Sequence, residues 1–317
     1  MITLLVPTNR DHRWLRSCLE SIKLNGPSFD FEVLLIVNNA SVTTFQNIEK
    51  VQQEVLPDAK LINAGVGSLS DALNHGLRNA EFEYIARLDS DDELCQGRIE
   101  AQIEVLELNP EVALVGTYVQ VISEDGNLGR IIRFPVDSSE IDARLKYGNC
   151  ISHPTVAFRK SVVMNVGMYS NNYPHAEDYD LWLRVAQTSK IRNLPLVGIN
   201  YRQHGDQVSS VYSAEQIGST RELAVCAIST VLNLSGKTLT AEDLSKLLSS
   251  TICRLNSKLL RKEKAQFETW QYVAFRHSFT LREKLSRIST ILLNDPYFLA
   301  YWLFSKVRYF WRRNNEN

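Results

Sequence analysis

The stretch Tyr84-Ile-Ala-Arg-Leu-Asp-Ser-Asp-Asp92 places three carboxylates within four residues at the end of an apolar run. A short run of this kind predicts a strand that is buried on both faces. Carboxylates this close repel one another, and a hard divalent cation such as Mg²⁺ or Mn²⁺ would relieve the repulsion. The stretch therefore predicts a metal site that also binds a diphosphate. An alternative on this motif alone, equally supported, is that the acidic turn caps a helix beginning near Gln96.

The sequence before this stretch alternates between apolar runs and segments with helical spacing. Expected strands cover residues 2–6, 33–37 and 60–62, and expected helices cover 13–24 and 69–79. Short apolar strands separated by helices predict an α/β fold with a mostly parallel sheet. Polar residues follow three of the strands: Pro7-Thr8-Asn9, Asn38-Asn39 and Asp89-Ser90-Asp91-Asp92. They should meet at one edge of the sheet, where a nucleotide would bind.

The sequence after the stretch divides into a mixed part and a helical part. A helix is expected over 96–108, a strand over 112–121, a helix over 139–147, a strand over 155–158 and a helix over 179–187. From residue 217 onward the pattern is helical, with segments 217–234, 241–264 and 281–293 and a final aromatic and basic helix over 296–313. The fold class is thus α/β with an all-helical C-terminal extension.

Two further motifs carry groups that can do chemistry. Asp178, in Glu177-Asp178-Tyr179-Asp180, falls in the first turn of an expected helix, where it could accept a proton from an attacking hydroxyl. Taken alone, a plain helix cap is the better interpretation of it. In Tyr201-Arg-Gln-His204, an arginine and a histidine two residues apart could meet a diphosphate or complete a metal shell. Taken alone, His204 is better read as a histidine of a surface loop.

Composition excludes several classes of protein. Of the 317 residues, 44% are hydrophobic and 22% are charged, which is typical of a folded domain and not of a disordered chain. The five cysteines are scattered and form no CxxC pair, which argues against a thiolate metal site and fits a reducing compartment. No segment reaches the roughly 18 apolar residues of a spanning helix, and the N-terminal residues do not resemble a signal peptide. A cytoplasmic protein is expected.

The charge is unevenly distributed. The formal net charge is −1, yet the segment 254–317 holds 13 lysines and arginines against five acidic residues. Eight aromatic residues also lie between Tyr297 and Trp311. Aromatic and basic side chains together favour the interface of an anionic membrane. The alternative is that the aromatic side chains pack on the preceding helices. A nucleic-acid partner is not expected, because these aromatics are too numerous and apolar for a solvated binding face.

Taken together, the motifs resemble family 2 glycosyltransferases, which have a GT-A fold. The resemblance is to a bacterial subgroup that builds O-antigen, capsule and lipooligosaccharide chains, and it covers roughly residues 1–210. It rests on motifs distributed along this range: Val6-Pro-Thr8, Leu73-Asn-His-Gly-Leu77, Tyr84 to Asp92, Arg98-Ile-Glu-Ala-Gln102, Asn109-Pro-Glu-Val112, Ser152-His-Pro-Thr155, Gly167-Met-Tyr169, Ala176 to Arg184 and Tyr201 to His204.

The resemblance implies an inverting, metal-dependent transfer of a hexose from a nucleotide sugar to a saccharide carried on a polyprenyl diphosphate. Asp178 would be the catalytic base, and Mn²⁺ or Mg²⁺ would be held by Asp91 and His204. Residues 1–115 would bind the donor, 116–215 the acceptor, and 216–317 would associate with the inner face of the membrane. The donor-binding residues that it implies are Pro7, Thr8, Asn9, Asn38, Asp89, Ser90, Arg202 and His204.

One departure leaves the donor's base open, with UDP favoured. Where relatives often have Asp-Asp-Gly-Ser after the second strand, this chain has Asn38-Asn39-Ala40-Ser41. An asparagine carbonyl can still accept a hydrogen bond from uracil, but without charge assistance. A rival function is a catalytically degenerate subunit that binds sugars or acts as a scaffold. A nucleotidyltransferase is a weaker rival, because residues 7–12 lack the glycines of its usual loop.

Overall fold

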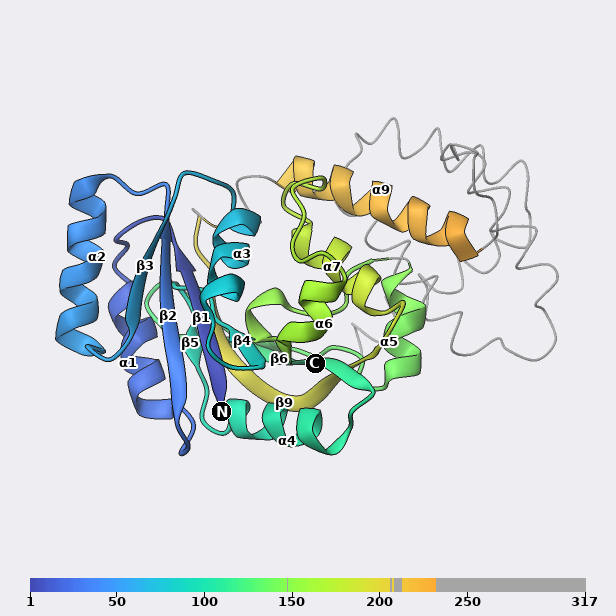
Figure 1. Ribbon diagram of the computed structural model, residues 1–317, viewed down its shortest axis with the longest axis horizontal. Coiled ribbons are helices and arrows are strands. Elements are labelled where there is room, and N and C mark those ends of the chain that lie inside the picture. The colour runs from blue at the N-terminus through green and yellow to red at the C-terminus, as the bar shows by residue number, and fades with distance from the viewer. Residues whose placement is uncertain (147, 206, 208–212, 232–317) are drawn as a thin grey trace, which may run out of the picture. The chain divides into compact units, whose positions relative to one another are not determined.

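The structure is a computed structural model that describes residues 1–146, 148–205, 207 and 213–231. Within these residues a single nine-stranded sheet runs in the order β3-β2-β1-β4-β8-β6-β9-β5, and β7 pairs with β6 (Figure 1). The strands are β1 (Ile2–Thr8), β2 (Phe31–Asn38), β3 (Lys60–Gly65), β4 (Tyr84–Arg87), β5 (Glu93–Leu94), β6 (Val112–Ile122), β7 (Leu128–Ile132), β8 (Ala157–Arg159) and β9 (Lys190–Arg202). The helices are α1 (Leu15–Asn25), α2 (Val42–Val55), α3 (Leu69–Asn79), α4 (Arg98–Leu108), α5 (Ser138–Leu145), α6 (Lys160–Asn165), α7 (Glu177–Val185) and α9 (Ser213–Val231), with a 3₁₀ turn η1 at His153–Thr155.

The first four strands are parallel, as their apolar sequences predict. Thr8 pairs with Val37 across β1 and β2, and Leu5 pairs with Arg87 across β1 and β4. This register places the carboxyl ends of β1, β2 and β4 at the same edge of the sheet. The polar residues that follow these strands therefore lie along one edge, which is the arrangement expected of an α/β nucleotide-binding fold.

The later strands make the sheet mixed. β8 is antiparallel to both β4 and β6, whereas β6 and β9 run parallel to each other. The long strand β9 is not predicted from sequence, because Pro195 and Gly198 interrupt its pattern. Both lie where the pairing with β6 shifts register. A Cβ at Gly198 would come within 2.1 Å of the Thr117 hydroxyl, so glycine permits the close approach of the two strands.

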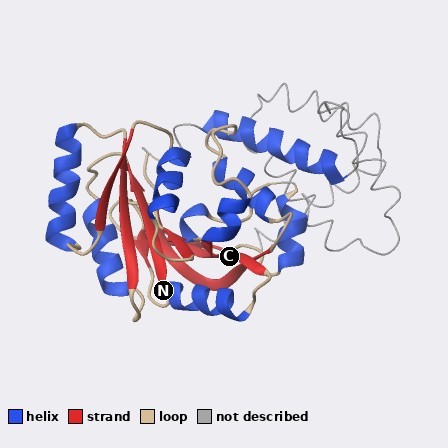
Figure 2. Ribbon diagram, in the orientation of Figure 1, coloured by secondary structure: helices blue, strands red, loops and turns tan. Residues whose placement is uncertain are grey.

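Helices cover both faces of the sheet (Figure 2). On one face, α3 packs on β1 and β2, with Leu5 and Ile36 in the same apolar cluster, and α5 packs on β9 and α7. On the other face, α1 and α2 bury apolar side chains in one cluster with Leu4, Val6 and Leu35, and α4 adds to this cluster where it packs on β6, β8 and β9. Close packing in these two apolar layers holds the strands in place. The loops that leave the carboxyl ends of the strands therefore start from fixed positions.

The expected boundaries of the chain fall at the following places in the structure. The boundary between residues 115 and 116 falls inside β6, so the sheet continues across it. Of the expected C-terminal region, α9 is described, and Gln216 and Ser219 donate hydrogen bonds to the carbonyls of His175 and Pro174. The remaining expected helices and the aromatic and basic segment 296–313 lie outside the described residues. In the part of the chain that is described, no helix has both the length and the apolar character needed to cross a membrane.

Candidate active site

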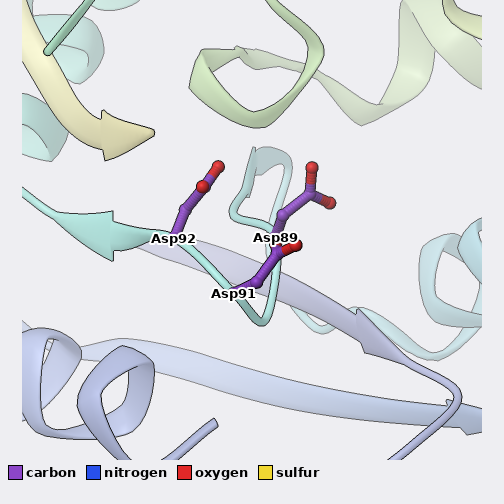
Figure 3. A group of neighbouring side chains, drawn as sticks. All are labelled: Asp89, Asp91 and Asp92. Atoms are coloured by element: carbon purple, nitrogen blue, oxygen red, sulfur yellow. The ribbon is translucent and has the colours of Figure 1, made fainter. Parts of the chain in front are cut away.

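The acidic turn follows β4 and gathers Asp89, Asp91 and Asp92 (Figure 3). One carboxylate oxygen of each residue lies within 4.8 Å of the other two. The turn is closed by a hydrogen bond of 3.1 Å from the Asp92 amide to the Asp89 carbonyl. Asp92 is fully buried, whereas the side chains of Asp89 and Asp91 are 30% and 21% exposed. The turn therefore presents two carboxylates outward and keeps one inside.

The alternative that this turn caps the next helix is wrong. Helix α4 begins at Arg98, and its N-cap is Gly97, with a φ of 75° and no side-chain capping bond. A left-handed backbone of this kind favours glycine. The acidic turn ends at Asp92, well before that cap, so the helix gives no reason for the presence of the three aspartates.

The electrostatics of the turn fit a bound cation. Burial raises the pKa of Asp89 to about 6, with Arg87 opposing the rise and Asp91 adding repulsion. Burial and the charges of Asp91 and Asp89 likewise raise the pKa of Asp92. Among the described residues, Asp92 Oδ2 is a buried oxygen without a hydrogen-bond partner. A cluster of oxygen ligands that repel one another suits Mg²⁺ or Mn²⁺, so these residues fit the predicted metal.

Strand β9 brings His204 to the acidic turn. His204 Nε2 lies 2.8 Å from Asp91 Oδ2, and the histidine is only 7% exposed. Its ring packs on the indole of Trp14, with the ring centroids 4.2 Å apart. The alternative of a surface-loop histidine is therefore wrong. The pairing places an imidazole and a carboxylate side by side, as two ligands of one ion would be.

Arg202 braces the same turn. Its guanidinium donates to the carbonyls of Asp91, Ser123 and Glu124 and forms an ion pair of 2.5 Å with Glu93. Its backbone amide donates to Asp92 Oδ1 at 2.9 Å. The side chain is 3% exposed. Within the described part of the chain, these bonds use four of the five N–H groups of the guanidinium, so one N–H on Nη2 is left for a further acceptor such as a donor phosphate.

The remaining residues predicted to bind the donor lie along the same edge. Thr8 is buried, and its hydroxyl donates to the Arg10 carbonyl at 3.0 Å. Asn38 donates through Nδ2 to the Gly67 carbonyl at 3.2 Å, which leaves the amide oxygen as the acceptor. The Ser90 hydroxyl lies 2.9 Å from His12 Nε2. Pro7 is buried at the end of β1, and Asn9 beyond it is exposed.

Asp178 lies in the first turn of α7, whose N-cap is Ala176. Its Oδ1 accepts the Tyr179 amide at 2.7 Å, and its Oδ2 accepts Asn149 Nδ2 at 2.7 Å. Asp178 is not the N-cap itself, but its Oδ1 accepts an amide of the first turn, so it also has the role that the alternative of an acidic first turn gives it. Burial raises the pKa of Asp178 to about 7, the charge of Glu177 adds to the rise, and the two hydrogen bonds oppose it. Such a carboxyl can take up a proton near neutral pH.

Arg87 links Asp178 electrostatically to the acidic turn. It is 3% exposed, and its Nη2 lies 2.5 Å from Asp89 Oδ1. Burial lowers the pKa of Arg87, but the charges of Asp89, Glu177 and Asp178 raise it overall. Asp178 in turn helps to raise the pKa of Asp89. The charge of Asp178 therefore affects the acidic turn, and the buried guanidinium of Arg87 acts on both acidic centres.

Sequence reasoning assigns no role to several residues that contact these centres. Arg87 stands in the quoted acidic stretch, so its spacing from Asp89 is the signal that could have found it. Trp14 belongs to a segment expected only to form a helix, and His12 and Asn149 lie outside every expected element. The contact of His12 with Ser90 spans 78 positions of the chain, and that of Asn149 with Asp178 spans 29. No local pattern in the sequence reports contacts over such separations.

Fold and site together define a GT-A type glycosyltransferase: an α/β sheet with an aspartate-rich turn at its carboxyl edge and a carboxyl with a raised pKa nearby. Comparison with known proteins gives the family. The sequence matches glycosyl transferase family 2 over residues 3–167, more than half of the chain, and the chain belongs to this family.

Similar proteins include enzymes of surface polysaccharide synthesis. The O-antigen biosynthesis glycosyltransferase WbnJ of Escherichia coli is 32% identical over 207 residues, covering 64% of this chain and 80% of that protein. The amylovoran biosynthesis glycosyltransferase AmsE of Erwinia amylovora is 32% identical over 199 residues, covering 62% and 73%. A UDP-Gal:alpha-D-GlcNAc-diphosphoundecaprenol beta-1,3-galactosyltransferase of E. coli is 35% identical over 126 residues, covering 38% and 43%.

Solved structures share the fold. S. aureus TarS (residues 1–349) in complex with UDP-GlcNAc aligns with a TM-score of 0.57 at 19% identity, covering 85% of this chain and 79% of that chain. The mannosyltransferase PcManGT from Pyrobaculum calidifontis, in complex with GDP-Man and Mn²⁺, aligns with a TM-score of 0.53 at 17% identity, covering 98% and 87%. At these identities the likeness extends to the fold alone.

Proposed function

We propose that this glycosyltransferase moves a hexose from a UDP-sugar to a saccharide on a polyprenyl diphosphate, with inversion, in the synthesis of a cell-surface polysaccharide. The observation that supports this most directly is Asp178, a carboxyl with a pKa of about 7 that acts electrostatically on the Asp89 turn. The reaction needs a base for the acceptor hydroxyl and a positive charge to stabilise the leaving diphosphate. Asp178 would supply the base, and a cation on the acidic turn would supply the charge.

On the donor side, Asp91 and His204 would hold Mn²⁺ or Mg²⁺, because their ligand atoms already lie 2.8 Å apart. Bound there, the metal would neutralise charge on the departing diphosphate. Asp89 would accept a hydrogen bond from a ribose hydroxyl. The nucleoside would lie against Pro7, Thr8 and Asn9, with the amide oxygen of Asn38 accepting from the base and Ser90 and Arg202 near the phosphates.

On the acceptor side, Asp178 would act as the base. As the acceptor oxygen attacks the anomeric carbon, its proton passes to a carboxylate oxygen of Asp178. The new carbon–oxygen bond forms on the face opposite the bond to the diphosphate, which breaks, and the electron pair leaves with the nucleoside diphosphate. A single displacement of this kind inverts the anomeric configuration. Asp178 is ionised in about half of the molecules near its pKa, so the base is available at neutral pH.

Two similar proteins support this choice of substrates. One acts on alpha-D-GlcNAc-diphosphoundecaprenol with UDP-Gal, and a structure with the same fold contains UDP-GlcNAc. A donor panel of UDP-Gal, UDP-Glc, UDP-GlcNAc and GDP-Man with Mn²⁺ should therefore give product on a synthetic lipid-diphosphate GlcNAc acceptor from at least one UDP-sugar. Mass spectrometry would detect the product, and NMR of the new linkage would show inversion. Absence of both transfer and metal-dependent donor hydrolysis would instead favour a degenerate sugar-binding subunit.

We further propose that the enzyme works on the inner face of a bacterial-type membrane, through the aromatic and basic segment 296–313. The support is its composition, because aromatic and basic side chains favour an anionic interface. The full chain should float with phosphatidylglycerol vesicles and not with phosphatidylcholine vesicles, and a chain ending at residue 295 should lose most of this binding. Equal flotation of the two chains would contradict the proposal.

A further inference from the structure

Asn149 donates the one side-chain hydrogen bond to Asp178 that the described residues contain. Its Nδ2 donates to Asp178 Oδ2 at 2.7 Å, while its Oδ1 accepts the Ile151 amide at 3.1 Å. The second bond fixes which end of the amide faces the carboxylate. Because the Tyr179 amide holds Oδ1, both oxygens of Asp178 are oriented, one by its own helix and one by a loop.

The loop that carries Asn149 is anchored at its far end on the sheet. The Thr155 hydroxyl donates to the Ser152 carbonyl at 2.8 Å and accepts the Thr117 amide at 3.1 Å. The Thr155 carbonyl accepts Gln102 Nε2 at 2.8 Å. Thr155, Thr117 and Gln102 are all fully buried. Residues 149–155, here called the arm, therefore start at Asp178 and end in the core between α4 and β6.

A second anchor joins the middle of the arm to α3. His153 Nε2 lies 2.9 Å from the Tyr169 hydroxyl. The backbone of Tyr169 is held by Asn74, which donates to its carbonyl at 2.8 Å and accepts its amide at 3.0 Å. Burial and the nearby Arg87 lower the pKa of His153 well below its usual value, so the imidazole stays neutral and the contact persists across the physiological range. Asn74 and His153 belong to Leu73-Asn-His-Gly-Leu77 and Ser152-His-Pro-Thr155, motifs to which donor and metal binding give no role.

We infer that Asn149 is a positioning residue, which the anchored arm holds against Asp178. With the Tyr179 amide on the other oxygen, it fixes the plane of the carboxylate, and a remaining lone pair of the carboxylate receives the acceptor's proton. The inference rests on the proposed function of Asp178 as the base. A carboxylate held from one side only could rotate about its side-chain bonds, and small displacements of a reacting group are costly. Asn149 also donates to the charged form of Asp178 and so keeps the carboxyl ionised at lower pH than burial alone would allow.

The groups that act on Asp178 come from several parts of the fold. Glu177 on the same helix opposes ionisation, and Arg87 at the end of β4 favours it. Asp89 and Tyr169 are further ionisable groups whose own pKa values respond to the charge of Asp178. Of the two hydrogen bonds to Asp178, only that from Asn149 can be removed by a side-chain substitution. A change at Asn149 therefore isolates one contact, while the charged neighbours stay in place.

The test is a direct titration of Asp178 in the full chain labelled with ¹³C at the aspartate carboxyl carbons. The Asp178→Asn variant assigns the resonance by its loss. We expect a midpoint near pH 7 in the parent protein, in line with its raised pKa. Asn149→Ala should raise the midpoint by about 0.5 to 1 pH unit, and Asn149→Asp should raise it further because it adds a like charge.

The matched control is Asn171→Ala. Asn171 is also exposed and donates to a different carboxylate, Asp71 Oδ1, at 3.0 Å. It should leave the Asp178 midpoint unchanged, and thermal unfolding would confirm that each variant is folded. An unchanged midpoint in folded Asn149→Ala and Asn149→Asp would overturn the inference. So would an equal shift in the Asn171→Ala control.

Kinetics separate this inference from the proposed function. With whichever UDP-sugar the donor panel shows to be active, Asn149→Ala should lower kcat about tenfold with little change in the donor's KM, and the acid limb of its pH profile should move upward. If Asp178→Asn retained full transfer, the proposed function would be wrong whatever the titration showed. If Asp178→Asn were inactive but Asn149→Ala had the parent's kcat and pH profile, only the positioning role would fail.

Discussion

Glycosyl transfer should fall by about 10²–10⁴-fold when Asp178 is replaced by Asn, while binding of the UDP-sugar stays intact. Asparagine has the same shape but cannot accept the acceptor's proton. Asp178 is the carboxyl whose burial raises its pKa to about 7, and it contacts a loop and its own helix rather than the aspartate-rich turn. Initial rates of transfer and the donor's dissociation constant, measured by calorimetry with Mn²⁺, would show the two effects separately.

The control for this substitution is Asp180→Asn, two residues further along α7. Asp180 forms an ion pair of 2.6 Å with Arg184. Among the described residues, its side chain forms no hydrogen bond or ion pair with Asp178 or with the acidic turn. Its loss should lower the temperature of unfolding and leave kcat within a few-fold of the parent value. Near-full turnover by Asp178→Asn would refute the assignment of the base.

Removing the proposed metal site should have an effect of similar size. Asp91→Asn replaces a charged ligand by a neutral one, and His204 Nε2 would lose the carboxylate that lies 2.8 Å away. We expect transfer at a fixed Mn²⁺ concentration to fall by at least about 10²-fold, because stabilisation of charge on the leaving diphosphate is lost. Chelation by EDTA should inactivate the parent enzyme, and added Mn²⁺ or Mg²⁺ should restore it.

Direct measurement of metal binding gives this prediction a second readout. Mn²⁺ bound to the protein can be followed by electron paramagnetic resonance in the absence of any donor. Asp58→Asn is the control, since Asp58 is exposed in the loop before β3, at the opposite edge of the sheet. The metal assignment fails if Asp91→Asn binds Mn²⁺ as the parent does, or if EDTA leaves transfer unaffected.

Much of the fold can be predicted from the sequence where local patterns decide it. The apolar runs of β1, β2 and β4 and the helix α3 lie where expected, because burial on both sheet faces requires continuous apolar residues. The strand β9 escapes prediction because it tolerates Pro195 and Gly198 only through register shifts against β6. Such shifts depend on the partner strand, which a local pattern does not contain.

The candidate site divides in the same way. Asp89, Asp91 and Asp178 stand out in the sequence because clustered carboxylates are costly without a compensating partner. The contacts that orient these three carboxylates cannot be recognised in the sequence. Nothing in the local sequence distinguishes Asn149 from other polar residues, but the loop places it 2.7 Å from Asp178. In the same way, nothing in the local sequence shows that Trp14 packs on His204. The roles of both depend on tertiary contacts.

The brace provided by Arg202 also bears on how the protein is made. The Asp92 carboxylate and the Arg202 amide are joined across 110 residues of chain, and among the described residues β5, which follows the acidic turn, pairs with β9. While the chain is being synthesised, the three aspartates leave the ribosome long before the strand that holds them in place. The nascent N-terminal half thus carries its carboxylates without the brace or His204. The proposed cation site would then be complete only late in synthesis, once residues 190–204 have been added and β9 has paired with β6.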